Sequence, residues 1–581
     1  MTRQVLEIPP LELPYDVRLN LPGSKSQANR LLGLAALLPG DRLLANLPCS
    51  DDVTLMIEGL RALGYTLHDV PGDPGRLHVK GGPPPSPGEG VIDCRLAGTT
   101  SRFLTAIAAI TPGRWTLTGS ERLRKRPIAP LLRSLRALGA KIEATDDRLP
   151  LRIEGAPLAG HPVELDPSRS SQFLSALLLI APVLGKRFRI ETSAEIPSRP
   201  YIDMTKSALN KVGWALREAD GRFTVRPVRG KRRRVLAVDT DWSAAGAWFV
   251  LDALTCSRFS DAQLWKGGLE QGDRRIPWTL RSMTGSDPLS INVDAFPDQL
   301  MNLAVFAARR HGRTQFIGAS NLRGKECDRL SVLVREFRKV GIRIEETSDG
   351  VVIEGPNRLR AAELDPEGDH RMAMAFGILA MMHEGIRILD PKCVDKSYPG
   401  FFDDLAAAQR SPRCIALIGM RAVGKTTLAR TLAKRLGATF RDTDDLVENL
   451  LGRRIPDIVR EEGWSAFRRT EEDAVTLGLE AGAVTAVGGG AVESPLVQRR
   501  LRDRAVVVWV REDADIIADR VRRDGRRPSL TGEDPAVEIR QVMAKREPLY
   551  RSLADIMLPP GLNLEERVEA CLSDLENLCS W

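Results

Sequence analysis

The chain has 581 residues, a length that predicts about three to four domains rather than one hydrophobic core. Hydrophobic residues make up 43% of it and charged residues 28%, as in globular proteins that fold in water. The net charge of +8 is small for this length, so composition alone gives little support for a role in binding nucleic acid.

The cysteines and the apolar runs further limit the kind of protein that this sequence can encode. The eight cysteines form no Cys-x-x-Cys pair and only six histidines are present, so neither a zinc cluster nor a disulfide framework is expected. The first ten residues do not look like a targeting segment, and the longest apolar run, 173–185, is too short to cross a bilayer. We therefore expect a cytoplasmic protein without membrane or nucleic-acid partners. The basic run 229–235 fits a solvated turn better than an anion-binding segment.

The first 400 residues repeat one pattern, a polar cluster followed at once by an apolar helix. The junctions are centred on Ser26, Thr99, Ser171, Trp242, Asp298 and His370. They are spaced by 73, 72, 71, 56 and 72 residues. Four segments between them predict an amphipathic helix that stops at a glycine and is followed by a hairpin; the glycines are Gly64, Gly139, Gly213 and Gly341. Residues 280–293 give a weaker fifth copy.

These copies predict six helix–strand units, grouped as two lobes of three. Helix N-termini carry free N–H groups and partial positive charge, so six of them converging on one cleft would form an anion site. Capping by Ser, Thr or Asp is the simpler explanation of any single junction. Capping does not explain why three of these helices have an arginine near their start, at Arg30, Arg102 and Arg371.

Eight motifs in this region occur in the order of a known family: LPGSKSQANR, LAGTTSRFL, RKRPI, SRSSQFLSALL, SRPYIDMT, RGKECDRL, DHRMAMAF and DKSYPGF. On these motifs residues 1–405 resemble the 3-phosphoshikimate 1-carboxyvinyltransferases, or EPSP synthases. The resemblance implies a two-lobed enolpyruvyl transferase fold of mixed α/β and α+β character, with lobes at 21–237 and at 1–20 plus 238–405. It also implies transfer of an enolpyruvyl group from phosphoenolpyruvate to shikimate 3-phosphate, with release of phosphate and without a cofactor.

The family pattern assigns roles to individual residues. Shikimate 3-phosphate is assigned to Lys25, Ser26, Arg30, Ser170, Ser171, Gln172, Ser198, Tyr201, Asp298, Asn321 and Lys325. Phosphoenolpyruvate is assigned to Lys25, Gly98, Arg126, Gln172, Arg329, Arg371 and Lys396. Catalysis is assigned to Asp298 as base, Glu326 as acid and Lys25 at the reacting centre. Without the resemblance, Asp298 would be interpreted as a helix cap and Glu326 as part of a solvated charge cluster.

Two residues depart from the family pattern. Leu96 stands where an asparagine is usual, which removes one polar contact near phosphoenolpyruvate, and Cys327 replaces a more usual Ser or Thr. The nearest competing family acts on UDP-N-acetylglucosamine and would have a reactive cysteine in the loop 121–130, where this chain has none.

A second phosphate-binding motif follows a short linker predicted at 406–412. Gly419, Gly424, Lys425 and Thr426 fit G-x-x-x-x-G-K-[ST] between a β-branched strand and an amphipathic helix. Loop amides of this motif cradle phosphates, its lysine reaches the β- and γ-phosphates, and its hydroxyl binds Mg²⁺. The region 413–581 is therefore predicted to be a P-loop kinase domain with a parallel sheet.

A further resemblance predicts the substrate of this kinase. FRDTDDLVE, GWSAFRRTEE, AVGGGAV, RRDGRRPSL and REPLYRSLAD are similar to motifs of the shikimate kinases. The resemblance assigns ATP to Gly419, Ala422, Gly424, Lys425, Thr426, Thr427 and Arg527, and Mg²⁺ to Thr426 and Asp442. It assigns shikimate to Asp444, Arg468, Gly489 and Arg546, with Lys425 and Asp444 in catalysis. Taken alone, DTDD is more typical of a solvated turn and GGG of a flexible loop.

Ala422, where many members have glycine, and Trp464, where glutamate is usual, depart from this second pattern. We expect a bifunctional shikimate-pathway enzyme whose kinase product, shikimate 3-phosphate, is the substrate of its transferase. The alternative from another class is a transferase half that only binds shikimate 3-phosphate or acts as a scaffold. The sequence leaves open the oligomeric state, the orientation of the two parts and any direct transfer of the shared intermediate.

Overall fold

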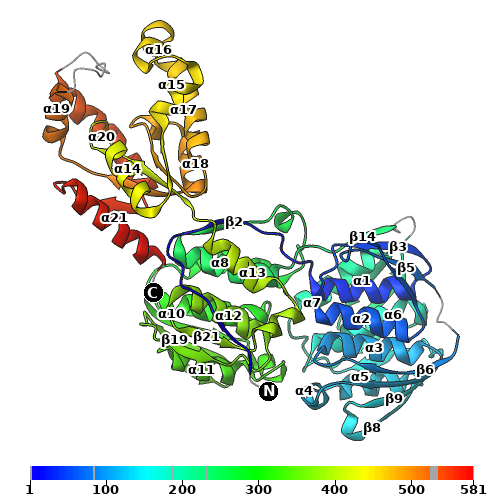
Figure 1. Ribbon diagram of the computed structural model, residues 1–581. Coiled ribbons are helices and arrows are strands. Elements are labelled where there is room, and N and C mark those ends of the chain that lie inside the picture. Colours follow the sequence, from blue (N-terminus) through cyan, green and yellow to red (C-terminus); the bar gives the residue numbers. More distant parts are fainter. Residues whose placement is uncertain (1–2, 83–85, 186, 229–232, 524–533, 580–581) are drawn as a thin grey trace. The chain divides into compact units, whose positions relative to one another are not determined.

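The computed structural model describes residues 3–82, 86–185, 187–228, 233–523 and 534–579. The chain forms two compact units that are not continuous in sequence (Figure 1). The first comprises Met1–Pro9, Leu19–Leu251 and Asp261–Asp403, and the second comprises Pro10–Arg18, Asp252–Ser260 and Asp404–Trp581. Helix α13 (Phe401–Gln409) covers the start of the expected linker. The domain boundaries given above stay a prediction.

Four sheets of the N-terminal region share one topology, in which a parallel pair of strands continues into an antiparallel hairpin. The first is β14-β3-β5-β4 (Val235–Ala237, Gly40–Ala45, Leu77–Gly81, Thr66–Asp69) and the second is β6-β7-β9-β8 (Gly88–Asp93, Gly113–Thr118, Leu151–Gly155, Lys141–Ala144). The third is β10-β11-β13-β12 (Val163–Leu165, Ile190–Thr192, Arg222–Pro227, Trp214–Ala219) and the fourth is β16-β17-β19-β18 (Leu289–Asn292, Gly312–Ile317, Gly350–Gly355, Arg343–Thr347).

Two smaller sheets complete the repeat. Parallel strands β20 (Ala362–Leu364) and β21 (Ile386–Leu389) are joined by β1 (Val5–Glu7), which pairs antiparallel with β21. Parallel strands β15 (Arg258–Ser260) and β2 (Asp16–Arg18) form the last pair, which belongs to the second compact unit. Each of the six predicted copies therefore has the same parallel strand pair.

The predicted hairpin over 280–293 is wrong. Helix α9 (Ile276–Ser282) is followed by β16, which pairs in parallel with β17 of the next copy. This copy therefore has no hairpin of its own, which explains the short spacing of 56 residues between its junction and the next.

The junction helices are apolar and buried, as predicted. They are α1 (Lys25–Leu37), α3 (Gly98–Ile110), α6 (Ser171–Leu184), α8 (Trp242–Thr255), α10 (Leu300–Arg309) and α12 (His370–Met382). In the first lobe α1, α3 and α6 contact one another at the centre of a core that runs from Ala28 to Val238 (Figure 1). No described helix is long and apolar enough to cross a membrane.

The second helix of each copy is amphipathic. These helices are α2 (Asp51–Ala62), α5 (Ala129–Ala137), α7 (Pro200–Lys211), α9, α11 (Arg329–Lys339) and α13, and a short α4 (Glu121–Lys125) precedes α5. The glycine predicted just beyond four of them has a positive φ, between 88° and 95°. A side chain is disfavoured in that conformation, which is why glycine ends these helices.

The second unit contains a five-stranded parallel sheet in the order β23-β24-β22-β25-β26. Its strands are Thr439–Asp442, Ala483–Ala486, Cys414–Ile418, Ala505–Val510 and Ile556–Leu558. The central strands β22 and β25 are wholly buried, as their continuous runs of hydrophobic residues predict for a sheet covered on both faces. The predicted fold class is therefore confirmed for both parts of the chain.

Eight helices follow β22 in the described part of the second unit. They are α14 (Lys425–Leu436), α15 (Thr443–Leu451), α16 (Ile455–Glu462), α17 (Trp464–Gly478), α18 (Pro495–Arg504), α19 (Ala514–Arg523), α20 (Pro535–Leu553) and α21 (Leu564–Cys579). Figure 1 shows α15, α16 and α17 gathered at one end of this unit, and they pack on one another around the small core of Val447, Ile458, Phe467 and Ala474.

Candidate active sites

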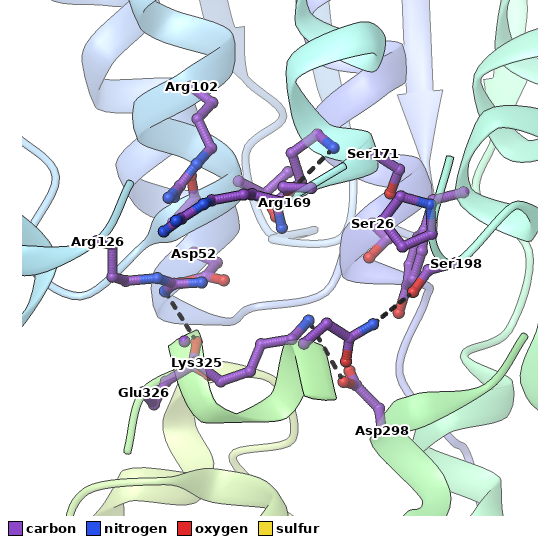
Figure 2. A pocket seen from close by; sticks show the side chains of 18 of the residues that line it. Ser26, Asp52, Arg102, Arg126, Arg169, Ser171, Ser198, Asp298, Lys325 and Glu326 are labelled. Atoms are coloured by element: carbon purple, nitrogen blue, oxygen red, sulfur yellow. Dashed lines mark hydrogen bonds and ion pairs between the residues drawn. The ribbon is translucent and has the colours of Figure 1, made fainter. Parts of the chain in front are cut away.

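One polar pocket of the first unit collects most of the residues predicted for the transferase (Figure 2). Its lining includes Lys25, Ser26, Arg30, Gly98, Arg126, Ser170, Ser171, Gln172, Ser198, Tyr201, Asp298, Asn321, Lys325, Glu326 and Arg329. Residues at the starts of five of the six junction helices lie in this lining, and only α8 contributes none. The expected convergence of helix N-termini is thus found for five of the six copies.

Local structure explains how some of these groups are held. Ser170 caps α6 by accepting a hydrogen bond from the Gln172 N–H at 3.2 Å. Ser198 has a positive φ of 53°, an uncommon conformation for serine. It is fixed by its own N–H, which donates to Asp294 Oδ1 at 3.1 Å, and by Asn321 Nδ2, which donates to its hydroxyl at 3.1 Å.

Arg30 lines the pocket, but its guanidinium is held by the protein. It donates to Thr205 Oγ1 at 2.8 Å, to the Ser26 carbonyl at 2.6 Å and to the Tyr201 carbonyl at 3.1 Å. Burial lowers the pKa of Arg30 to about 10, which still leaves it charged at neutral pH. Arg30 therefore organises the start of α1 and adds positive charge to the pocket.

Arg329 lies at the centre of a buried charge network. Its guanidinium donates to Asp298 Oδ1 at 2.9 Å, to Glu326 Oε2 at 3.2 Å and to Asp369 Oδ2 at 2.7 Å. One cation thus orients both the expected base and the expected acid. Asp369 also caps α12 by accepting from the Arg371 N–H at 2.8 Å.

Cations outnumber the carboxylates around the expected acid. Lys396 Nζ lies 2.5 Å from Glu326 Oε1, and Arg126 Nη1 lies 3.5 Å from the same oxygen. Burial by itself raises the pKa of Glu326, but Lys396 and Arg126 outweigh burial and hold the pKa well below its usual value. Glu326 is therefore ionised in this arrangement at neutral pH.

The expected base is also ionised. Burial raises the pKa of Asp298, but Arg329 and Lys325 outweigh burial and lower the pKa below its usual value. Lys325 Nζ lies 3.9 Å from Asp298 Oδ1, and Arg371 Nε lies 3.6 Å from Oδ2. A carboxylate surrounded by cations is a weak base until those cations find other partners.

The pocket as a whole is built for anions. Seven cationic side chains and three carboxylates are among its lining residues. Burial and the nearby Lys25 hold the pKa of His370 well below its usual value, so this histidine is neutral. Among the described residues, Arg126 Nε and two nitrogens of Arg371 are buried without a hydrogen-bond partner. Buried donors without acceptors suit a ligand that brings phosphate and carboxylate oxygens.

Sequence reasoning missed several residues of this site. Asp52 and Arg169 line the pocket, and Asp369 contacts Arg329 from outside the lining. Thr99, Arg102 and His370, expected only as residues of converging helix starts and given no ligand, also line it. The Asp52 carboxylate lies 3.0 Å from Lys25 Nζ. Asp52 and Asp369 stand at helix starts, where capping is the usual explanation of a carboxylate. Their contacts with Lys25 and Arg329 are visible only in the structure, because these cations are far away in sequence.

The phosphate-binding loop of the second unit has the predicted form. It joins β22 to α14, and Gly419 and Gly424 have positive φ angles of 142° and 96°. Lys425 Nζ donates to the carbonyls of Gly419 and Met420 at 3.0 and 2.9 Å. The lysine side chain therefore folds back over the loop, and both are expected to bind the phosphates of ATP.

Thr426 and Asp442 are brought together as predicted. The Thr426 hydroxyl donates to Asp442 Oδ2 at 2.8 Å, and Asp442 caps α15 by accepting from the Asp444 N–H at 3.0 Å. A hydroxyl and a carboxylate beside a phosphate loop fit Mg²⁺, which takes few protein oxygens and completes its shell with water and substrate phosphates. No group of three or more His, Cys, Asp or Glu side chains arranged to hold a metal is found in the described ranges.

The residues predicted for shikimate gather around the glycine triplet 488–490. A side chain at Gly490 would collide with the Arg468 guanidinium, and a Cβ at Gly488 would come 3.3 Å from Asp444 Oδ1. The Tyr550 hydroxyl donates to the Gly489 carbonyl at 2.6 Å.

Both predicted shikimate arginines have acidic partners. Arg468 pairs with the buried Glu471, and Arg546 Nε donates to Glu493 Oε1 at 2.7 Å. Arg468, Arg546 and Trp464 line one surface pocket. Arg527, predicted to cover the ATP phosphates, lies outside the described residues, as does part of the basic run 229–235.

Comparison with known proteins identifies the two parts. Residues 14–405 match the family model of EPSP synthase (3-phosphoshikimate 1-carboxyvinyltransferase). The chain belongs to this family. Residues 421–576 match the shikimate kinase family, so the chain is a fusion of the two.

Similar proteins agree with this assignment. The 3-phosphoshikimate 1-carboxyvinyltransferase of Citrobacter koseri is 35% identical over 67% of this chain and 96% of that protein. Pentafunctional AROM polypeptide 2 of Lodderomyces elongisporus is 30% identical over 93% of this chain and 39% of its own length. The chain thus spans about two fifths of the pentafunctional relatives that it matches. A solved EPSP synthase from Acinetobacter baumannii shares the fold, with a TM-score of 0.57 and 22% identity over 70% of this chain and 98% of that one.

The phosphate loop yields a test of one departure from the kinase pattern. Ala422 has a φ of 61°, and a left-handed alanine costs roughly 1–2 kcal/mol, more than the backbone entropy that glycine adds to the unfolded chain. We expect Ala422→Gly to stabilise the second unit by about 0.5–1 kcal/mol in urea unfolding.

The matched control for this test is Ala438→Gly. Ala438 lies in the loop before β23 and is not among the described residues with positive φ, so the same change there should destabilise the unit by a similar amount. Destabilisation by Ala422→Gly would contradict the account of a strained loop.

Proposed function

We propose that this chain catalyses two consecutive reactions of the shikimate pathway. The second unit transfers the γ-phosphoryl group of ATP to shikimate, and the first transfers an enolpyruvyl group from phosphoenolpyruvate to the resulting shikimate 3-phosphate. The observation that carries the proposal is the joint presence of two anion sites, one with Asp298 and Glu326 bridged by Arg329, the other with Lys425 beside Thr426 and Asp442.

The transferase site has the charges that this pair of substrates requires. Each substrate carries one phosphate and one carboxylate, and planar guanidinium groups bind both in forked pairs. We assign phosphoenolpyruvate to the side of Arg126, Arg371 and Lys396. The hydroxyl and amide groups of Ser198 and Asn321, which already bond to each other, are assigned to shikimate 3-phosphate.

The reaction removes two protons, first from the attacking hydroxyl and later from a methyl group, and delivers one to the methylene carbon. The 5-hydroxyl of shikimate 3-phosphate bonds to C2 of phosphoenolpyruvate as its proton passes to a base, while the methylene carbon gains a proton. The C–O bond to phosphate then breaks with its electron pair leaving on the phosphate, and the methyl group returns a proton to the deprotonated acid to restore the double bond. We assign the base to Asp298 and the acid to Glu326, whose carboxylates are held by the same guanidinium.

Substrate binding would prepare both groups for these roles. Lys396 and Arg126 hold the pKa of Glu326 down, so a bound phosphoenolpyruvate that takes over these cations allows that pKa to rise. The same reasoning applies to Asp298, whose cations Arg329 and Lys325 face both substrates. This arrangement of cations around the two carboxylates therefore favours substrate binding first and proton transfer second.

In the kinase unit we assign the ATP phosphates to the loop amides and Lys425, and shikimate to Asp444, Arg468, Gly489 and Arg546. Asp444 would accept from the hydroxyl that attacks the γ-phosphorus, and the two arginines would pair with the shikimate carboxylate. Thr426 and Asp442 would hold Mg²⁺, which neutralises charge on the transferring phosphoryl group when bound. We propose no cofactor for the transferase and a cytoplasmic location for the whole.

Lys425→Ala should separate the two activities. Loss of the P-loop lysine removes the charge that stabilises the transferring phosphoryl group, so we expect phosphorylation of shikimate to fall by about 10³-fold or more. Enolpyruvyl transfer from added shikimate 3-phosphate should stay within about twofold of wild type. Coupled ADP release and phosphate release measure the two, and joint loss would contradict independent sites.

Asp298→Asn should give the opposite result. The amide keeps the shape of the side chain but cannot take the hydroxyl proton, so we expect enolpyruvyl transfer to fall by about 10²–10⁴-fold with kinase activity retained. A transferase that works normally with asparagine at this position would rule out Asp298 as the base.

A further inference from the structure

Arg169 lines the transferase pocket and has no role in the assignments above. It stands directly before Ser170, the residue that caps α6. Figure 2 shows its side chain reaching from the start of that helix toward the part of the pocket where Arg102 and Arg126 lie. A third guanidinium therefore faces the anion-binding side of the pocket.

The neighbouring arginines differ from Arg169 in their partners. Arg102 is buried, and its guanidinium donates to the carbonyls of Gly98 and Pro127 at 2.7 and 2.8 Å. Arg126 Nη1 lies 3.5 Å from Glu326 Oε1. Arg169 is exposed, and no hydrogen bond or ion pair to it is found in the described part of the chain. Its charge acts on Asp166, which is half-buried.

We propose that Arg169 binds the phosphate group of phosphoenolpyruvate together with Arg126, an inference that rests on the proposed function. Like charges placed around one space repel unless an anion lies between them, and a phosphate offers enough acceptor oxygens for two guanidinium forks. Phosphoenolpyruvate is preferred over shikimate 3-phosphate because Ser26 and Ser198, assigned to the latter, lie on the other side of the pocket in Figure 2.

Arg169→Ala tests this assignment in the full-length protein. Removing one charge-assisted contact that is made equally in the ground and transition states raises KM without lowering kcat. We expect the KM for phosphoenolpyruvate to rise about tenfold, with kcat within about twofold and the KM for shikimate 3-phosphate unchanged. Arg169→Lys keeps the charge but loses the forked guanidinium, so its KM for phosphoenolpyruvate should lie between those of Arg169→Ala and wild type.

The matched control is Arg133→Ala. Arg133 is also exposed and also acts on Asp166, but it does not line the pocket, so all three constants should match wild type. An equal rise in the KM for phosphoenolpyruvate with Arg133→Ala would show a general charge effect and overturn the proposal. A rise confined to the KM for shikimate 3-phosphate in Arg169→Ala would overturn it as well.

A binding measurement separates this proposal from the proposed function. L-Phospholactate has the phosphate and carboxylate of phosphoenolpyruvate but no double bond, so it cannot react. Titrated calorimetrically in the presence of shikimate 3-phosphate, it should bind about tenfold more weakly to Arg169→Ala than to wild type. Equal binding overturns the role of Arg169. A wild-type protein that binds the analogue but forms no enolpyruvyl product contradicts the proposed function alone.

Discussion

The transferase site depends on one buried cation, Arg329. Its guanidinium bonds to Asp298, Glu326 and Asp369, which come from three different segments. Removing the cation would leave the buried Asp369 and the half-buried Asp298 and Glu326 without their common partner, a situation that costs several kcal/mol. The network continues from Glu326 to Arg126 and so joins the two lobes within the first unit. The same few contacts therefore set the charge of the pocket and the positions of its two candidate catalytic carboxylates.

The repeated copies of the fold supply further positive charge to the pocket through the starts of their helices. Each copy buries an apolar helix against a sheet, so the polar start of that helix faces the remaining open space, and five such starts meet in one pocket. The kinase unit uses the same physics once, at the loop between β22 and α14, where backbone amides and Lys425 are held by glycines with positive φ. Both sites thus combine helix N-termini with added cations, an arrangement that suits phosphate.

Much of this architecture could be predicted from the sequence, because repeat spacing, helix-ending glycines and the P-loop are local signals. The Thr426–Asp442 contact and the pocket of Lys25, Asp298 and Glu326 follow the motifs. Asp52 and Asp369 were missed because a carboxylate at a helix start fits capping equally well, and their cation partners are far away in sequence. The false hairpin at 280–293 arose because a short helix and the first strand of the next copy mimic one. The compact units were also not predictable, since 10–18 and 252–260 pair with each other and Tyr15 forms a bridge to Pro412 of the second unit.

The central claim is that both halves of one chain act in sequence on a shared intermediate. Phosphorus NMR of the purified protein with shikimate, ATP, Mg²⁺ and phosphoenolpyruvate tests it most directly. The account predicts that ADP, free phosphate and an enolpyruvyl phosphate ester all appear. Accumulation of shikimate 3-phosphate while phosphoenolpyruvate persists would contradict it, since only the kinase would then be active.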